Sequence, residues 1–341
     1  PTCARPVPVP RPCAGASGAC GTHRHKTGVA VLLLLLACHP TPTWEIAYES
    51  SSALSGVWGT SADDVFIVGG DDAHGTIDRW DGASWSPMDV PDGTNLLVWS
   101  YGFGSDDVYA VGRGGSALHW DGSTWTRLDT GTTQDLWGVF GFATDDLWVV
   151  GGDLDAEAPT LLHWNGGVFQ PITLDPAQNP QGASALFKVW GVGDTLFAVG
   201  GRGLILRLVD GAWTHISGGA AADDDFVSLW GTSEDHIVAV GGRSGARLAT
   251  WDGSAWTTTA PSATGGLNAV FMDDPDVAHI GGIYGWVGTY DVASGEIAPE
   301  DLLTDVDIHA TWGDGDRTVW AVGGRFLDPY RGVALKRTEG R

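Results

Sequence analysis

A pattern of about 41 residues recurs seven times between residue 54 and the end of the chain, and it limits the possible folds more than any other feature. Each copy contains an aromatic residue that follows a Val-like residue and usually precedes glycine, as in "SGVWG" at 55–59. A second run ends in glycine, as in "DVYAVG" at 107–112. The seven aromatic residues are Trp58, Tyr101, Phe140, Trp190, Trp230, Phe271 and Trp312. Such a repeat indicates an array of similar units that pack against one another.

Each copy contains four segments with the length and composition of strands, which we call a, b, c and d. In the second copy they are "LLVWSYG" at 96–102, "DVYAVG" at 107–112, "SALHWDG" at 116–122 and "WTRLDTG" at 125–131. Glycine, aspartate and serine separate them, as expected for tight turns. Four-stranded units repeated at this period predict an all-β fold, a seven-bladed β-propeller. An open solenoid of seven repeats is the alternative.

The seventh copy favours the closed ring. Its last segment, "RGVALKRTEGR" at 331–341, aligns with strand c of the second copy, and Arg337 stands where the second copy has Trp120. The missing strand d is expected at the other end of the propeller, because Trp44 precedes Leu54 much as Trp125 precedes the next strand a. Closure of a ring needs such a permutation, and it would cover both edge strands. We therefore predict a propeller over residues 43–341.

A "WDGxxW" phrase joins strands c and d in several copies. In "HWDGSTW" at 119–125 the Asp-Gly pair supplies a tight turn. Trp120 and Trp125, on either side of it, are expected to cover the seam to the neighbouring blade. We interpret the phrase as architecture, because a motif repeated around a ring is not a single catalytic site.

These motifs resemble kelch-type and BNR-type propellers. They are more similar to the "VWG…DVWAVG…HWDGxxW" repeats of exported Gram-negative lipoproteins. The resemblance covers about residues 43–341 and implies a propeller fold and export, with no assigned activity. The "DGxxW" phrase is one residue short of the sialidase Asp-box, so sialidase activity is not implied. The Gly-His pair of WD40 units is also missing.

The first part of the chain is expected to be a leader, residues 1–37. Basic residues precede an apolar run, Val29 to Ala37, which suits the central region of a signal peptide and is too short to span a bilayer. The proline-rich residues 1–21 fit neither part and are expected to precede the true translation start. The end of the run, "LLAC" at 35–38, resembles a lipoprotein signal. That resemblance implies lipidation of Cys38, a lipidated tether over 38–42 and attachment to the outer membrane of the cell envelope. An ordinary signal peptide is the alternative.

Charge and cysteine content limit the possible partners and the ways in which the fold can be stabilised. The net charge of −24 argues against nucleic acid, because phosphate binding needs a basic surface. After Cys38 the chain contains no cysteine, so its fold cannot depend on disulfides. We expect a monomer without cofactor or metal, in contact with the membrane through its lipid anchor alone.

Charged residues are expected to separate onto the two faces of the ring. In propellers, the d–a and b–c connections emerge on one face, the top, and the a–b and c–d turns on the other, the bottom. Aspartates recur in the bottom turns, where they either cap the turns or bind calcium; we favour capping. The candidate ligand-binding residues follow strand b or lie in the long last loop of the top face: Arg113, Arg202, Arg243, Arg325, Tyr330 and Arg331. Surface ion pairs are the alternative role for these arginines.

The predicted function is therefore that of a non-enzymatic scaffold that binds a protein or an anionic glycan through its top face. No residue is assigned a catalytic role. The alternative is a glycan hydrolase or lyase, which would need paired carboxylates beside the arginines. The acids available on long top loops are Asp153, Asp155, Glu157 and Asp328.

Overall fold

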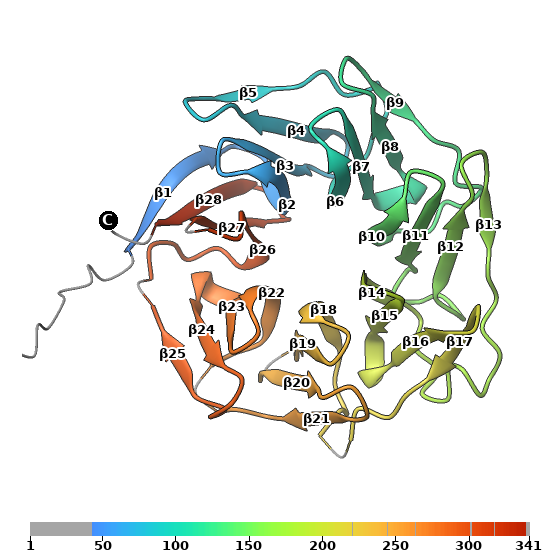
Figure 1. Cartoon of the computed structure of the whole chain (residues 1–341). Coiled ribbons are helices and arrows are strands. Elements are labelled where there is room, and N and C mark those ends of the chain that lie inside the picture. The colour runs from blue at the N-terminus through green and yellow to red at the C-terminus, as the bar shows by residue number, and fades with distance from the viewer. Residues whose placement is uncertain are drawn as a thin grey trace, which may run out of the picture. The chain divides into compact units, whose positions relative to one another are not determined.

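The computed structural model describes residues 43–338 except 220, 244, 263, 301 and 317. These residues lie in one compact unit, Pro40–Arg341. They form seven antiparallel sheets of four strands, arranged as blades around a central axis (Figure 1). The predicted all-β, seven-bladed propeller is confirmed. The predictions for residues 1–42, including Cys38, lie outside the described residues.

The first four blades contain β2 to β17. Blade 1 has β2 (Ala53–Ser61), β3 (Asp64–Gly70), β4 (Gly75–Trp80) and β5 (Trp85–Pro87). Blade 2 has β6 (Leu97–Gly104), β7 (Asp107–Gly112), β8 (Ala117–Trp120) and β9 (Trp125–Arg127). Blade 3 has β10 (Leu136–Ala143), β11 (Asp146–Gly151), β12 (Thr160–Trp164) and β13 (Phe169–Pro171). Blade 4 has β14 (Leu186–Val192), β15 (Thr195–Gly200), β16 (Ile205–Val209) and β17 (Ala212–His215).

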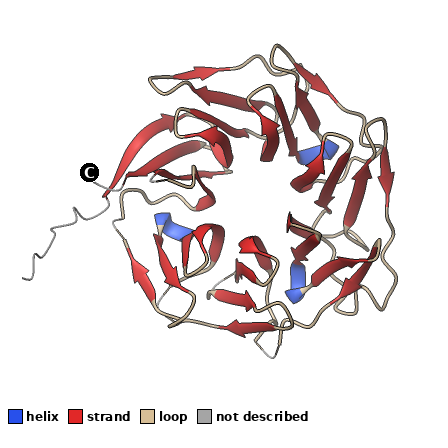
Figure 2. Ribbon diagram, viewed as in Figure 1, coloured by secondary structure: helices blue, strands red, loops and turns tan. Residues whose placement is uncertain are grey.

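The last three blades contain the remaining strands. Blade 5 has β18 (Phe226–Ser233), β19 (His236–Gly241), β20 (Arg247–Trp251) and β21 (Trp256–Thr259). Blade 6 has β22 (Leu267–Asp274), β23 (Val277–Gly282), β24 (Val287–Asp291) and β25 (Ile297–Pro299). Blade 7 has β26 (Ile308–Gly313), β27 (Thr318–Arg325), β28 (Arg331–Thr338) and β1 (Thr43–Ser50). Three single-turn 3₁₀ helices follow strand b of blades 2, 4 and 6 (Figure 2): η1 (Arg113–Gly115), η2 (Gly201–Gly203) and η3 (Ile283–Gly285).

The ring is closed by the first strand of the described chain. β1 pairs antiparallel with β28, so that blade 7 has the order β1-β28-β27-β26. Trp44 is the register partner of Arg337. The predicted permutation is confirmed, and it excludes the open solenoid because no blade lacks its outer strand.

The core lies between the blades. Strand b is almost fully buried in every blade, and indoles of strand d pack on aromatic residues of the preceding blade's strand b. Trp213 meets Trp148 with ring centroids 5.4 Å apart, and Trp256 meets Phe197 at 5.5 Å. The prediction for the "WDGxxW" phrase holds most fully for its second indole: Trp125 is 5% exposed. Trp120 is less buried and donates its N–H to the Ser105 carbonyl at 3.2 Å.

The seven aromatic residues of the repeat lie on the innermost strands, one in each blade. Consecutive rings approach across blade boundaries: Trp58 lies 6.3 Å from Tyr101, Tyr101 4.8 Å from Phe140, and Trp190 5.9 Å from Trp230. These contacts pack the innermost strands of neighbouring blades against one another.

Candidate functional site

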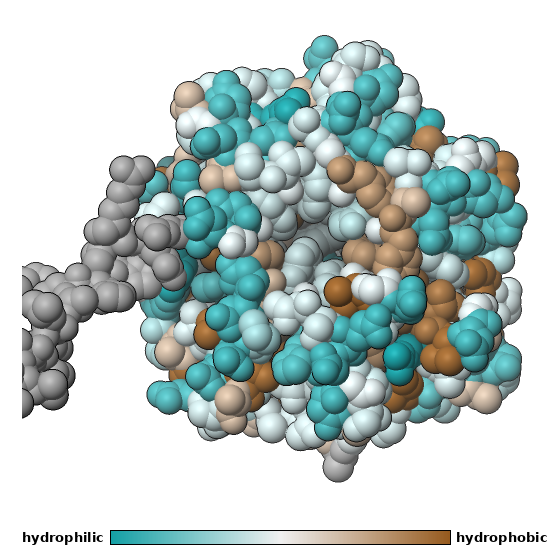
Figure 3. Space-filling model, viewed as in Figure 1, coloured by the Kyte–Doolittle hydropathy of each residue, from teal (hydrophilic) through white to brown (hydrophobic). Residues whose placement is uncertain are grey.

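A cavity of about 390 Å³ lies where the innermost strands of all seven blades begin. The second residue of each inner repeat segment lines it: Ser55, Val98, Trp137, Phe187, Val227, Asn268 and His309. Top-face loops add Leu154, Gly242, Arg243, Ile283 and Phe326. The space-filling view shows a hollow at the centre of the ring (Figure 3). The cavity therefore opens among the b–c loops, on the face where the sequence predicts a ligand.

Several polar side chains of the wall are held by backbone groups. His309 donates its Nε2 hydrogen to the Gly324 carbonyl at 2.9 Å and stacks on Phe326. Burial lowers the pKa of His309, so its neutral form is favoured. Trp137 donates its indole N–H to Gly152 at 2.8 Å, and Asn268 donates to Ile308 at 3.2 Å. These bonds hold His309, Trp137 and Asn268 in place in the wall.

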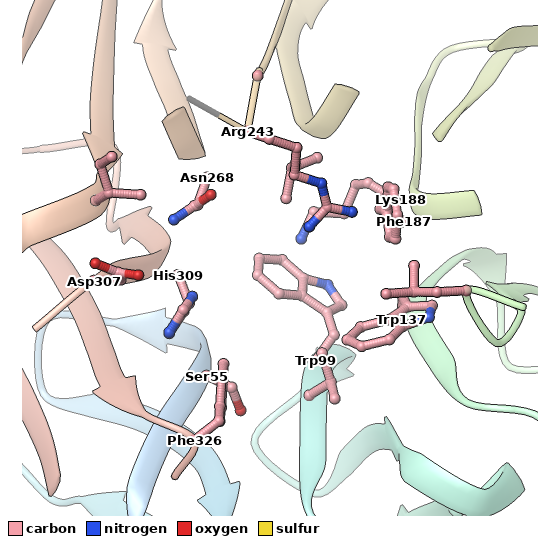
Figure 4. Close-up of a pocket in the computed structure, with 15 residues that line it drawn as sticks. Ser55, Trp99, Trp137, Phe187, Lys188, Arg243, Asn268, Asp307, His309 and Phe326 are labelled. Atoms are coloured by element: carbon pink, nitrogen blue, oxygen red, sulfur yellow. The ribbon is translucent and has the colours of Figure 1, made fainter. Parts of the chain in front are cut away.

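Lys188 is the unusual residue of this wall. It is 5% exposed, on β14, and its ammonium lies over the indole of Trp99 (Figure 4). Burial lowers its pKa well below the ordinary 10.5. No carboxylate pairs with it among the residues that the structure describes. A buried amine without a counter-ion destabilises the fold, so its presence points to a role in binding.

Arg243 is the predicted residue that reaches the cavity. Its Nε forms an ion pair with Asp225, and its guanidinium lies 5.4 Å from the ring centre of Phe187. Arg243 and Lys188 both line the cavity (Figure 4). The site therefore combines a lysine amine and a guanidinium with aromatic walls.

The structure places the other predicted residues on the top face outside the cavity. Arg113 and Tyr330 both bond to Asp72, each at 2.8 Å. Arg331 pairs with Asp305 at 2.9 Å and with Glu49 at 3.4 Å. For these residues the geometry agrees with the alternative of surface ion pairs. Asp72 thus receives both Arg113 and Tyr330, one on each carboxylate oxygen.

Arg202 and Arg325 have no carboxylate partner in the described part of the chain. Arg202 donates Nη1 to the carbonyl of Gln181 at 3.2 Å, and its backbone N–H is bound by Asp225 at 2.9 Å. Arg325 ends β27 and is exposed. Neither arginine lines the cavity. Both side chains remain available to a ligand on the surface that surrounds the cavity.

Two residues near the cavity occupy a backbone conformation that favours glycine. Arg202 has φ 55° and Tyr284 φ 57°, at the position where η1 has Gly114. Carboxylates that precede the next inner strand hold these turns: Asp225 accepts from Arg202 and Asp307 accepts from the Tyr284 N–H at 2.8 Å. Tyr284, which the sequence analysis missed, is 73% exposed. Large side chains thus stand where glycine would be less strained.

The carboxylate pair required by the enzymatic alternative is not found at the cavity. Asp307 is its one acidic wall residue within the described ranges, and this carboxylate binds the Tyr284 N–H. Asp153 accepts a hydrogen bond from the Asp135 N–H at 2.9 Å. Within the described ranges the wall thus offers one carboxylate, whereas hydrolysis of a glycan by acid–base chemistry uses a pair.

Aspartates of the bottom face cap their turns, as favoured from the sequence. Asp121 accepts from the N–H groups of Ser123 and Thr124, each at 2.8 Å. The Ser123 hydroxyl and these N–H groups lower the pKa of Asp121 to about 2. Asp81 and Asp252 make the same bonds in blades 1 and 5.

Among the described residues no group of three or more His, Cys, Asp and Glu side chains is placed to hold a metal. No helix in the same residues has the length and apolarity needed to span a membrane.

Comparison with known proteins supports the fold. No family model and no curated protein matches the chain. Solved propellers are similar in structure. The structure described as YCF48 bound to D1 peptide has a TM-score of 0.65 at 12% identity, covering 87% of this chain and 97% of that one.

YCF48 from Cyanidioschyzon merolae has a TM-score of 0.64 at 16% identity, covering 86% of this chain and 98% of that one. The WD40 repeats of RRP9 have a TM-score of 0.66 at 14% identity, covering 86% and 97%. At these identities the likeness shows a β-propeller. The kelch-like or BNR-like lipoprotein type remains a prediction.

Proposed function

We propose that this protein is a non-enzymatic scaffold of the cell envelope, which binds a partner protein through the top face around the central cavity. The observation that carries the proposal is the cavity itself, where Lys188 is buried without a counter-ion beside Arg243 and aromatic walls. Such a site gains stability when a ligand supplies an anionic group.

Exposed apolar side chains around the cavity favour a protein over a glycan. Leu154 is 65% exposed, Tyr284 73% and Leu327 73%, and all three lie on b–c loops of the top face. Apolar side chains with a polar surround are typical of protein-binding surfaces. A structurally similar propeller, YCF48, has been solved with a bound peptide, which agrees with this choice.

The strained turns support the same assignment. Arg202 and Tyr284 adopt positive φ angles, whereas Gly114 occupies the equivalent place in blade 2. A large residue in this conformation costs free energy and is often retained for function. Both side chains border the surface that we assign to the partner.

Attachment to the membrane belongs to the same proposal. The lipoprotein-like "LLAC" sequence supports acylation of Cys38, and β1 starts a few residues later at the bottom of the ring. A lipid there would leave the top face directed away from the membrane. Partition of the full chain into detergent, compared with Cys38→Ser, tests this part; equal partition would contradict it.

Capture of partners tests the binding surface. Residues 40–341, one compact unit, would be used to recover proteins from an envelope extract. The triple variant Leu154→Ser, Tyr284→Ser, Leu327→Ser is expected to lose the proteins that the wild type retains. The matched control is Phe103→Ser with Phe142→Ser, two bottom-face residues that are 37% and 40% exposed.

An anionic glycan is the competing ligand. Two results together would show that the ligand is a glycan and not a protein. The wild type would be retained on uronate or sialate arrays, and Arg202→Ala with Arg243→Ala would abolish this retention. Capture of proteins would be unchanged in the triple variant. Turnover of such a glycan would overturn the non-enzymatic assignment.

A further inference from the structure

The chemistry of the cavity identifies the group that it binds. Residues 43–338 contain two lysines, Lys188 and Lys336. Lys336 is half-buried on β28, with its ammonium 5.1 Å from the ring centre of Trp320. Lys188 is nine-tenths buried and lines the cavity. An indole face alone compensates poorly for the hydration that a buried ammonium loses.

Among the described residues, no carboxylate contacts the Lys188 amine. Arg243 is already paired with Asp225, whose other oxygen holds the Arg202 N–H. Asp307, across the cavity, accepts from the Tyr284 N–H. His309 is favoured in its neutral form. On the neighbouring strand, Gly138 approaches the Lys188 backbone and contributes no charge.

A single carboxylate matches this arrangement. It would meet the Lys188 ammonium and the terminal nitrogens of Arg243, for which no other partner is present in the described residues. A phosphate dianion would require a further cation. The walls are Trp99, Trp137, Phe187 and Phe326, so the group that carries the carboxylate should be aromatic or apolar.

We infer that the cavity binds a carboxylate carried by an aromatic or apolar group, and that this carboxylate contacts Lys188 and Arg243. The inference rests on the proposed function, because it names the group that a partner would insert into the cavity. In the free protein, burial favours the neutral amine of Lys188. A bound carboxylate favours the ammonium, so binding and protonation are linked.

Phenylacetate is a suitable probe, because its carboxyl group stays ionised above about pH 6. Isothermal titration of residues 40–341 is expected to show binding that weakens as pH rises, approaching about ten-fold per pH unit where free Lys188 is neutral. Titration in two buffers of different ionisation enthalpy should show uptake of up to one proton. Phenylacetamide, which has no charge, should bind at least about ten-fold more weakly.

Three variants make the test specific. Lys188→Met should lose most of the affinity and its dependence on pH. Lys188→Arg should bind phenylacetate without proton uptake, because guanidinium stays charged. Lys336→Met is the matched control and should behave as wild type. Circular dichroism would establish that each variant is folded.

The outcomes separate this inference from the proposed function. Equal binding of phenylacetate by wild type and Lys188→Met, no binding of phenylacetate, or binding without proton uptake would each overturn it. The capture experiment with Leu154, Tyr284 and Leu327 replaced does not depend on Lys188. Loss of captured protein in that experiment would support the docking surface even if the carboxylate inference failed.

Discussion

Lys188 links folding and binding at the scale of one residue. Its ammonium is removed from water without gaining a carboxylate, and its pKa falls because burial penalises the charged form. The other blades place uncharged residues, such as Gly56, Gly138 and Ser228, at this repeat position. The free-energy cost of burying a lysine therefore arises in blade 4 alone. The fold does not require a lysine at this position.

Replacement of Lys188 by methionine is expected to stabilise the free protein. The free energy of unfolding should rise by about 1–3 kcal/mol at pH 7, because an unpaired polar group leaves the interior. The unfolded state binds more protons than the folded state between the lowered pKa and 10.5, so wild-type stability increases with pH. The gain from Lys188→Met should shrink accordingly in urea titrations at pH 7 and pH 10. A loss of stability at pH 7 would contradict this prediction.

Tyr284 gives a second test at the same scale. Tyr284→Gly relieves a positive φ and is expected to leave the free energy of unfolding unchanged or to raise it by up to about 1 kcal/mol. Capture of partners should nevertheless weaken. Denaturant unfolding and capture would be measured on the same preparation, with Tyr290→Phe as a control elsewhere in blade 6. A large loss of stability would show that the side chain serves the fold.

Among elements, the outer pair of blade 7 departs most from the repeat. Arg337 on β28 faces Trp44 on β1 in the register, where blades 1, 2 and 5 have two tryptophans. Arg337 is 6% exposed and contacts Glu300 through two nitrogens, at 2.9 and 3.1 Å. The Trp44 indole N–H also donates to Glu300. One carboxylate from the end of blade 6 thus joins both outer strands of blade 7.

Removal of one partner from this cluster should be costly. Arg337→Met is expected to lower the free energy of unfolding by about 3–5 kcal/mol, because it leaves Glu300 without its buried cation. Adding Glu300→Gln to Arg337→Met should restore a substantial part of the lost free energy of unfolding. A double-mutant cycle in urea measures the coupling, with replacement of the exposed Arg127 on β9 (Arg127→Met) as a control. Additive effects would contradict the proposed role of the cluster.

The bottom turns predict how acid affects the same elements. Hydrogen bonds from Ser84, Ser123, Ala255 and Ser294 lower the pKa values of Asp81, Asp121, Asp252 and Asp291. Because the folded pKa lies below the unfolded one, the ionised aspartates stabilise the fold above about pH 4. This contribution is lost as pH falls through the folded pKa, which is about 2 for Asp121.

Replacing the four aspartates by asparagine should make unfolding less sensitive to pH between about 4 and 2. Asparagine can cap the same turn, as Asn165 does in blade 3 by accepting from the Val168 N–H at 3.1 Å. Circular dichroism during acid titration would measure the transition. An unchanged pH dependence would show that other carboxylates control acid unfolding.

At the scale of the molecule, β1 determines whether the ring is continuous. Without β1, the backbone edge of β28 would be free to pair with another chain. Deletion of residues 1–50 is expected to lower cooperativity in urea and to produce dimers or larger species in size-exclusion chromatography. Deletion of residues 1–39 is the control and should remain monomeric. A monomeric, cooperative protein after the longer deletion would show that closure is dispensable.

The sequence alone determined the number of blades, their four strands and the permutation that closes the ring. Those properties follow from a pattern of about 41 residues that recurs along the chain. Each copy of the pattern therefore supports the assignment of strands in the others. It also indicated the top face and Arg243. Lys188 was not predicted, although an ionic residue within an apolar inner strand is a visible signal, because the predicted site was confined to the top-face loops.

The tertiary structure alone decided which residues share the cavity. Ser55 and His309 are separated by most of the propeller sequence, and they line one space because the ring closes. It also decided which arginines are already neutralised: Arg113 by Asp72 from the preceding blade and Arg331 by Asp305. Charge in a sequence shows which groups exist, whereas burial and distance between elements determine whether a charge is available to a ligand.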